Sequence, residues 1–166
     1  MTIDVHELIE EIYAEKYSRS RASKKNRKSI GDFWLSDTHA VNVKSNNLDK
    51  NNYSPNLVSA SRVNKWLNKG MDLSFIFVDY TISNGEVLIK SDSGLVPVQN
   101  ISWSCLSIQA QGKGVIQKSK PLQIKEQTKK DWLKCMAGDY LRFIYSQFSN
   151  LCELEQIYLK VLASDE

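Results

Sequence analysis

The 166-residue chain has the composition of a soluble folded domain, with 42% hydrophobic residues, 25% charged residues and only 7 Gly and 3 Pro. These values exclude collagen-like, low-complexity and disordered classes, and the length suits a single domain with one substantial core. No apolar run approaches the roughly 20 residues that a membrane span needs, and acids stand in the N-terminal segment where a signal peptide carries Lys or Arg. We therefore expect a cytoplasmic protein with no membrane partner.

The cysteines and the distribution of charge further limit the class of protein to which the chain can belong. Cys105, Cys135 and Cys152 are odd in number and widely spaced, which fits neither a disulfide framework nor a CxxC zinc site, so we expect reduced, packed thiols. The net charge of +3 hides a basic run between residues 16 and 28 that contains no acid. This run is either a solvated loop or an arm that follows nucleic-acid phosphates, with Arg27 and Lys28 as candidate contacts.

The first seventy residues predict two helices around a hairpin. Residues 3–17 place apolar and acidic side chains at helical spacing, which predicts an amphipathic helix. Two short apolar runs, residues 30–35 and 40–44, flank a polar tetrad and predict a β-hairpin. Residues 46–56 are rich in Asn, which favours a loop. Residues 57–68 then predict a second helix that ends near a glycine.

The rest of the chain predicts strands followed by one long helix. Residues 73–82 and 86–89 surround an Asn-Gly pair, which is the strongest short signal for a hairpin. Residues 96–98 and 101–108 predict one or two further strands, and a turn follows over residues 109–114. Thr128 is the predicted N-cap of a C-terminal helix whose apolar residues continue at helical spacing to Leu162.

This order of elements predicts a mixed α/β (α+β) fold with one sheet. We expect a single domain in three parts: a helix with the basic arm over residues 1–28, the sheet and its loop over residues 29–125, and the C-terminal helix over residues 126–166.

The polar residues of the first predicted hairpin gather on one face. Asp32 lies on the first strand, and Asn42 and Lys44 are two positions apart on the second, so they share a face. An acid on one strand can therefore meet an amide and a lysine on the other. Taken alone, this arrangement also suits a solvated hairpin face, because such combinations are common by chance.

The segments around this hairpin carry a family resemblance. GDFWL, VNVKSNN and DKNNYSPNLVSASRV are followed by SFIFVDYTISNGEVL, ISWSCLSIQ and TKKDWLKCMAGDYLRFI. In this order they resemble the PD-(D/E)xK nuclease superfamily and, within it, the type II restriction endonucleases of the HincII and EcoRV branch, over residues 30–148. The resemblance implies a restriction-endonuclease-like central mixed sheet flanked by helices. It also implies an endonuclease that hydrolyses phosphodiester bonds of double-stranded DNA at a short specific site. Such an enzyme depends on Mg²⁺, for which Mn²⁺ can substitute, and uses no small-molecule cofactor.

The resemblance assigns the catalytic set to Asp32, Asn42 and Lys44. By position, Asp32 matches the first metal carboxylate, Lys44 matches the catalytic lysine, and Val43 matches the residue whose backbone carbonyl completes the metal shell. Mg²⁺ prefers hard oxygen ligands and keeps several waters, so a carboxylate beside a carbonyl leaves room for the phosphate and the nucleophile. The chain departs from the family pattern at Asn42, where the family usually has Asp or Glu.

Three explanations of Asn42 stay open. In the first, the site recruits another acid, and Glu11 or Glu15 of the first helix are the preferred candidates. In the second, the site works with the amide of Asn42. In the third, the chain is a form that does not cleave DNA. We favour the first two, because Asp32 and Lys44 are both present.

The segment 46–56 is either a solvated loop or the element that reads DNA bases, because an amide offers a donor and an acceptor in one plane. The resemblance places Tyr53 where a related enzyme inserts a side chain beside the base stack. The candidate DNA-binding residues are Asn46, Lys50, Asn52, Tyr53, Asn56, Arg62, Arg27, Lys28, Gln109 and Gln111.

The expected partners are double-stranded DNA and a second copy of the chain. One active site cuts one strand, so a homodimer, built through the first or the last helix, is the simplest way to cut both. Two rival functions remain: a nuclease-fold DNA-binding protein without cleavage, and a DNA repair or recombination nuclease that recognises structure.

Overall fold

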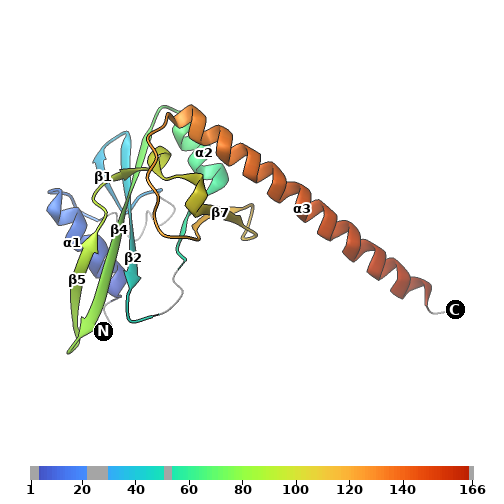
Figure 1. The fold of residues 1–166 in the computed structure, drawn as a ribbon, viewed down its shortest axis with the longest axis horizontal. Helices are drawn as coiled ribbons and strands as arrows, with labels where there is room; N and C mark the ends of the chain where they lie inside the picture. Colours follow the sequence, from blue (N-terminus) through green and yellow to red (C-terminus); the bar gives the residue numbers. More distant parts are fainter. Residues whose placement is uncertain (1–3, 22–29, 51–53, 165–166) are drawn as a thin grey trace.

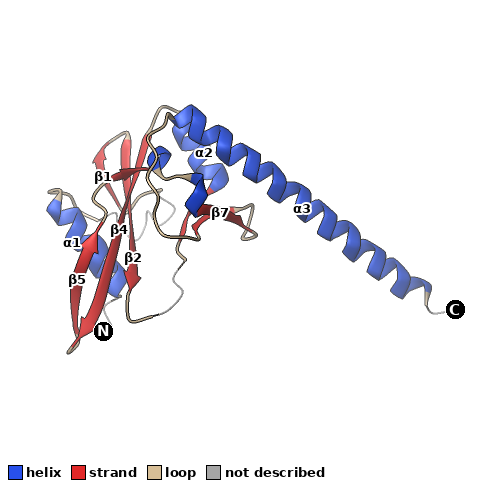
Figure 2. Cartoon of the chain, viewed as in Figure 1, coloured by secondary structure: helices blue, strands red, loops and turns tan. Residues whose placement is uncertain are grey.

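The computed structural model describes residues 4–21, 30–50 and 54–164. Its helices and strands are α1 (Val5–Lys16), β1 (Phe33–Ser36), β2 (His39–Asn47), β3 (Asn56–Ser59), α2 (Ala60–Asn68), β4 (Asp72–Ser83), β5 (Glu86–Asp92), β6 (Val96–Pro97), β7 (Leu106–Gln109), β8 (Val115–Lys118) and α3 (Lys129–Ala163). The 3-10 turns η2 (Val98–Asn100) and η3 (Trp103–Cys105) lie between β6 and β7. The predicted mixed fold, a sheet flanked by helices, is confirmed (Figures 1 and 2).

A mixed sheet forms the centre of the molecule. In the described part of the chain it has five strands, in the order β1-β2-β4-β5, with β6 pairing with β4. β2 and β4 pair in parallel, from His39 opposite Asp72 to Asn47 opposite Tyr80, whereas β1 runs antiparallel to β2 and β5 runs antiparallel to β4. The pairing of β1 with β2 goes no further than Phe33 opposite Val41. Among the described strands, none pairs with the outer edge of β2 beyond Val41.

The two faces of this sheet bury different partners. α1 packs on one face, where the core comprises Ile9, Tyr13, Ala14, Phe33, Val41, Val43, Ile76, Val78 and Tyr80. On the other face, Ala40, Leu73 and Phe75 belong to a larger core that also includes residues of α2, β3, β8 and α3. Burial of each large apolar side chain contributes roughly 1.5–3 kcal/mol, so both helical layers hold the sheet in place.

A second sheet corrects the expectation of a single one. In the described residues, β3 pairs with β8 and β8 pairs with β7, all antiparallel. The helix predicted over residues 57–68 begins only at Ala60, because the Ser59 hydroxyl caps it by accepting the Arg62 N–H. The residues before Ser59 are therefore free to form β3. The loop predicted over residues 46–56 is also too long, since β2 continues to Asn47.

The predicted C-terminal helix is confirmed as α3. The Thr128 hydroxyl caps it by accepting the Asp131 N–H at 3.1 Å. Trp132 is fully buried, and its indole N–H donates to the Ile101 carbonyl at 2.9 Å. None of the helices in the described ranges combines the length and the apolarity that a bilayer crossing demands.

The cysteines are free thiols, as predicted, but only one is packed. Cys105 is buried, whereas Cys135 and Cys152 are exposed. Both exposed thiols lie on α3, on parts of the helix surface that no core residue covers, which corrects the expectation that all three are packed.

Gly31 allows the chain to approach β2 closely just before Asp32. A Cβ atom at residue 31 would lie 2.9 Å from Ala40 Cβ and 3.0 Å from the Val41 carbonyl oxygen. Because one of these contacts is backbone, we predict that Gly31→Ala lowers the free energy of unfolding by about 1–3 kcal/mol in urea denaturation. Gly138→Ala is the control, since the nearest atom to its Cβ is an Arg142 nitrogen at 3.9 Å, and it should stabilise α3 by up to about 1 kcal/mol. Equal effects of the two substitutions would contradict this account of Gly31.

Candidate active site

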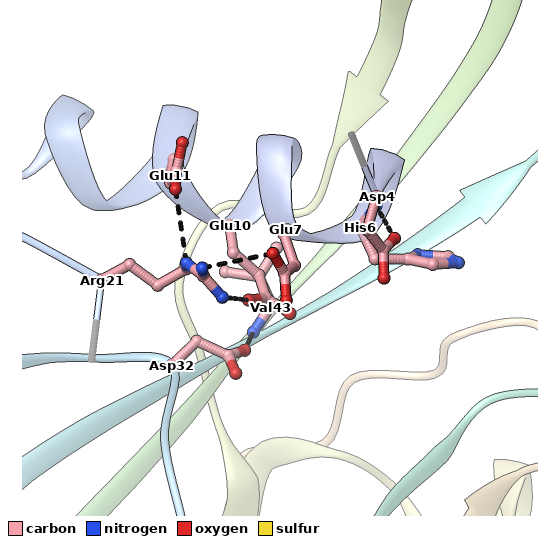
Figure 3. Close-up of polar contacts among 8 residues, drawn as sticks. All are labelled: Asp4, His6, Glu7, Glu10, Glu11, Arg21, Asp32 and Val43. Atoms are coloured by element: carbon pink, nitrogen blue, oxygen red, sulfur yellow. Dashed lines mark hydrogen bonds and ion pairs between the residues drawn. The ribbon is translucent and has the colours of Figure 1, made fainter. Parts of the chain in front are cut away.

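Asp32 lies at the point where the chain joins the edge of β2. Its backbone N–H donates to the Val41 carbonyl at 2.7 Å, and its carboxylate Oδ2 accepts the Val43 N–H at 2.7 Å (Figure 3). The carboxylate thus occupies the place that a strand carbonyl would take opposite Val43. In an extended strand the N–H and C=O of one residue point to the same edge, so the Val43 carbonyl faces the edge at which Asp32 lies.

Asn42 adds a buried oxygen that lacks a partner. Asn42 and Lys44 are both half-buried and alternate along β2, so they share a face of the strand. The Asn42 Nδ2 donates to the Ile30 carbonyl at 3.3 Å, which ties β2 to the segment that precedes Asp32. Its Oδ1 is buried and accepts no hydrogen bond from any described residue. A buried acceptor of this kind is unfavourable, and it is available to a cation or to a donor on a ligand.

Burial and mutual attraction govern the ionisation of Asp32 and Lys44. Burial raises the pKa of the Asp32 carboxyl, although the Val43 N–H and the Lys44 charge act in the opposite direction. Burial lowers the pKa of the Lys44 ammonium, although the Asp32 and Glu10 charges oppose this. Each group therefore depends on the other to remain charged. Perturbed pKa values with specific charge partners are typical of functional sites.

The acid that α1 brings to this site is Glu10. Burial and then repulsion from Asp32 raise the pKa of Glu10 to about 7, while the charges of Arg21 and Lys44 partly counter the rise. Glu11 and Glu15 were the preferred candidates, whereas Glu10 is the α1 acid whose charge acts on both Asp32 and Lys44. Glu11 is 53% exposed at its side chain and Glu15 is exposed. Glu10 adjoins the fully buried Ile9, but Glu15 adjoins the buried Ala14 in the same way, so no signal in the sequence separates Glu10 from the other acids of the helix.

Arg21 connects Glu10 to the other acids of α1. Its guanidinium lies 3.4 Å from a Glu7 oxygen, 3.4 Å from a Glu10 oxygen and 3.6 Å from a Glu11 oxygen (Figure 3). These acids share one side of the helix because they are three and four residues apart. The Arg21 charge also lowers the pKa of Asp32. This role of Arg21 was not predicted, because in the sequence it is only one residue of the basic run.

The structure brings two of the predicted DNA contacts together on the second sheet. Asn56 Nδ2 donates to Gln111 Oε1 at 2.8 Å, and Gln117 Nε2 donates to Asn56 Oδ1 at 3.3 Å. We call Asn56, Gln111 and Gln117 the amide cluster; Gln117 was not predicted. Gln109, at the end of β7, is exposed and donates to Ser107 instead.

The remaining predicted DNA contacts are dispersed. Arg62 is exposed on the first turn of α2, and Lys50 is exposed after β2. Asn46 donates to Asp79 Oδ1 at 2.9 Å. Arg27, Lys28, Asn52 and Tyr53 lie outside the described residues.

A cleft of about 590 Å³ is lined by Lys44 and by residues of both sheets. Lys44, Asn46 and Phe77 line it from the central sheet. Lys118, at the end of β8, and Lys120 line it from the other, and the Lys118 ammonium lies 5.7 Å from the centroid of the Phe77 ring. Neither lysine was among the predicted DNA contacts. Asp79 and Asp92 also line the cleft, so three lysines stand against two carboxylates in its walls.

The oxygen donors at the edge of β2 fit a hard cation. The described residues contain no group of three or more His, Cys, Asp or Glu side chains that could hold a metal ion. The donors present are the Asp32 carboxylate, the Asn42 Oδ1 and the Val43 carbonyl, which suit Mg²⁺ with several retained waters and lack the nitrogen and sulfur ligands of a structural zinc site. The unpartnered Asn42 Oδ1 supports this fit.

Comparison with known proteins adds no assignment: no protein-family profile matches the chain, and no curated protein matches it. The resemblance to restriction endonucleases therefore stays a prediction from the residues.

The raised pKa of Glu10 predicts a specific dependence of stability on pH. The folded protein keeps Glu10 protonated up to about pH 7, whereas its ordinary pKa is 4.5. The stability linked to this group is therefore fully present below pH 4.5 and is lost as the pH rises towards 7. We predict that Glu10→Gln, which cannot ionise, gains roughly 1–3 kcal/mol of unfolding free energy relative to wild type across this interval.

Urea denaturation without divalent cations measures this difference at each pH. Glu15→Gln is the control, because this exposed acid should leave the wild-type pH dependence unchanged. If the Glu10→Gln curve runs parallel to the wild-type curve at every pH, the raised pKa of Glu10 is wrong.

Proposed function

We propose that this protein is a Mg²⁺-dependent endonuclease that hydrolyses phosphodiester bonds of double-stranded DNA at a short specific site, as type II restriction endonucleases do. The observation that supports this best is the meeting of Asp32, the buried Asn42 Oδ1 and Lys44 at one edge of β2. Lys44 also lines the cleft that Lys118 and Lys120 line from its other side. A carboxylate, a neutral oxygen and a half-buried ammonium beside a cleft with two further lysines suit phosphodiester hydrolysis.

The residues divide the chemistry between them. Asp32, Asn42 and the Val43 carbonyl would hold the cation, and a bound Mg²⁺ would polarise the phosphate and acidify a water. Lys44 stabilises the negative charge that develops on the phosphate during the attack of water. Its partial burial makes this interaction stronger than it would be in bulk water. Glu10, with a pKa of about 7, is suited to accept the proton of the attacking water near neutral pH.

DNA binding is divided in the same way. Lys118 and Lys120 in the cleft bind backbone phosphates, which position the duplex without reading its sequence. The amide cluster reads base edges, because Asn and Gln side chains match the donor and acceptor of adenine in the major groove. The acting form is a homodimer, which cuts both strands, and we place it in the cytoplasm.

A DNA-binding protein without cleavage is the second candidate function. Asn42 favours it, because an amide at this position leaves Asp32 as the one carboxylate among the described donors at the edge of β2. Both functions would use the same cleft and the same amide cluster, so that cleavage is what separates them.

Substitution of Lys44 tests the catalytic assignment. We predict that the wild-type protein converts plasmid DNA to discrete fragments with Mg²⁺, and that Lys44→Ala slows cleavage by about 100- to 1,000-fold, because one stabilising charge is lost from the transition state. Affinity for DNA should change far less than the rate. Single-turnover cleavage of a supercoiled plasmid and filter binding measure the two quantities.

Lys65→Ala, on the exposed side of α2, is the matched control and should cleave like wild type. Among the acids of α1, Glu10→Gln should reduce cleavage whereas Glu15→Gln should not. Specific DNA binding without cleavage by the wild type, in Mg²⁺ and in Mn²⁺, would establish the second candidate function.

The division of DNA contacts predicts two different binding defects. Asn56→Ala should weaken binding to the cognate site far more than to random duplex, since it removes a base-reading amide. Lys118→Gln should weaken both equally and reduce the slope of log affinity against log salt by about one. Cleavage fragments identify the cognate site, and titrations at several salt concentrations supply the slopes. The reverse pattern would exchange the two assignments.

A further inference from the structure

The C-terminal half of α3 has no partner within the described chain. Near its start, Trp132 and Met136 are buried in the core, and Tyr140 packs against the same core. From residue 148 to residue 164, by contrast, every side chain is exposed, and Figure 1 shows this part of the helix projecting away from the rest of the molecule. We call residues 141–164 the distal arm.

The distal arm has one apolar face. Nine large apolar side chains share it, each between 47% and 76% exposed: Leu141, Tyr145, Phe148, Leu151, Leu154, Tyr158, Leu159, Val161 and Leu162. The opposite side is mostly polar and carries Arg142, Ser146, Ser149, Glu153, Gln156 and Lys160, with Ile157 as an exposed apolar residue beside them. Helices of proteins owe most of their stability to the packing of such an apolar face. The distal arm therefore needs a cover that the described part of the chain does not provide.

The spacing of the apolar residues indicates what kind of cover fits. Leu141, Phe148, Leu151, Tyr158 and Leu162 follow one another at steps of seven, three, seven and four residues. These steps keep to the two apolar positions of a heptad, the pattern with which one helix packs along another, and Glu155 is the charged residue in the same series, between Phe148 and Leu162. The chain itself carries a helix of this kind, so a second copy is a matching occupant.

The area of the face is large enough for a stable dimer. A half-exposed aromatic or long aliphatic side chain offers on the order of 100 Å², so the nine residues offer roughly 900 Å² per chain. Stable interfaces bury about 800 Å² per partner, and the largest apolar patch of a typical monomer covers about 300–600 Å². The face thus has the size of an interface.

Charge is compatible with the same occupant. Within the distal arm, Arg142 and Lys160 balance Glu153 and Glu155, so two arms carry no net charge that would drive them apart. A helix that lies on a membrane surface instead has a polar face rich in Lys and Arg, which this arm lacks.

α1, the other helix considered for a dimer contact, is already packed. Its apolar residues Ile9, Tyr13 and Ala14 are buried within the chain, and its acids bind Arg21. Of the two helices, α3 is the one with an uncovered apolar face.

We propose that the distal arm packs against the distal arm of a second copy of this chain, so that the protein is a homodimer held by paired α3 helices. This contact supplies the dimer that double-strand cleavage requires. The contact needs neither DNA nor a cation, so it can be tested independently of nuclease activity.

Sedimentation equilibrium of the full chain, without DNA and without divalent cations, tests the proposal. We expect a mass of twice 19.0 kDa at micromolar concentrations. The double variant Leu151→Glu, Tyr158→Glu should dissociate at least about 100-fold more readily, as interfaces do when central side chains are lost. Both residues are exposed and distant from the packed core, so the variant should keep the near-UV circular dichroism of its core tryptophans, whereas the far-UV helical signal of the uncovered distal arm should fall.

Ser149→Glu, Gln156→Glu is the matched control, because it adds the same charge to the opposite face of the same helix, and it should remain dimeric. A wild-type protein that stays monomeric would overturn the proposal, as would a Leu151→Glu, Tyr158→Glu variant that stays dimeric. Binding of a monomeric wild type to phosphatidylserine vesicles would assign the face to a membrane instead. Asp32→Asn should keep the dimer mass while it loses cleavage, which separates this proposal from the proposed function.

Discussion

The parallel pairing of β2 with β4 is the contact on which the rest of the structure depends. Parallel strands need a long crossover, and here the crossover contains β3 and α2. It brings α2 to the face of the sheet opposite α1, so both faces are buried, as parallel strands require. β1 is much shorter than β2, and the Asp32 carboxylate therefore closes the edge that β1 leaves open, by accepting the Val43 N–H. Unequal strand lengths thus create the candidate site.

The charges at this edge are balanced only in part. Asp32 and Glu10 repel each other, while Lys44 and Arg21 attract both, and burial penalises the charged forms. Transfer of a charged group from water to the protein interior costs several kcal/mol, and an ion pair offsets this cost only when its geometry is good. Such a site is less stable than a neutral one would be, and functional sites commonly hold strain of this kind. The raised pKa of Glu10 is the clearest sign that the balance is incomplete.

Local signals made the helices, hairpins and caps predictable, whereas contacts between distant segments were not. The Asn84-Gly85 pair and Thr128 act on their immediate neighbours, and the structure has the expected hairpin and helix start. β3 was missed because its four residues, which end at the helix cap Ser59, look like the beginning of that helix. Asn56 and Gln111 are 55 residues apart, so their hydrogen bond depends on the pairing of β3 with β8. Glu10 could be separated from Glu11 only once the face of α1 that packs on the sheet was known.

Asn42 is the residue at which burial and cation binding oppose each other most directly. A carboxylate here would be a third acid beside Asp32 and Glu10, whose pKa values are already raised, and it would raise them further. It would also lose the hydrogen bond to the Ile30 carbonyl, because an ionised carboxylate has no proton to donate. The amide therefore keeps the segment before Asp32 attached to β2 when no cation is bound, and it still offers one oxygen. At the proposed cation site, the attraction for the cation would then come from the charges of Asp32 and Glu10, so the position of the α1 acid would matter more in this chain than in one with a carboxylate at residue 42.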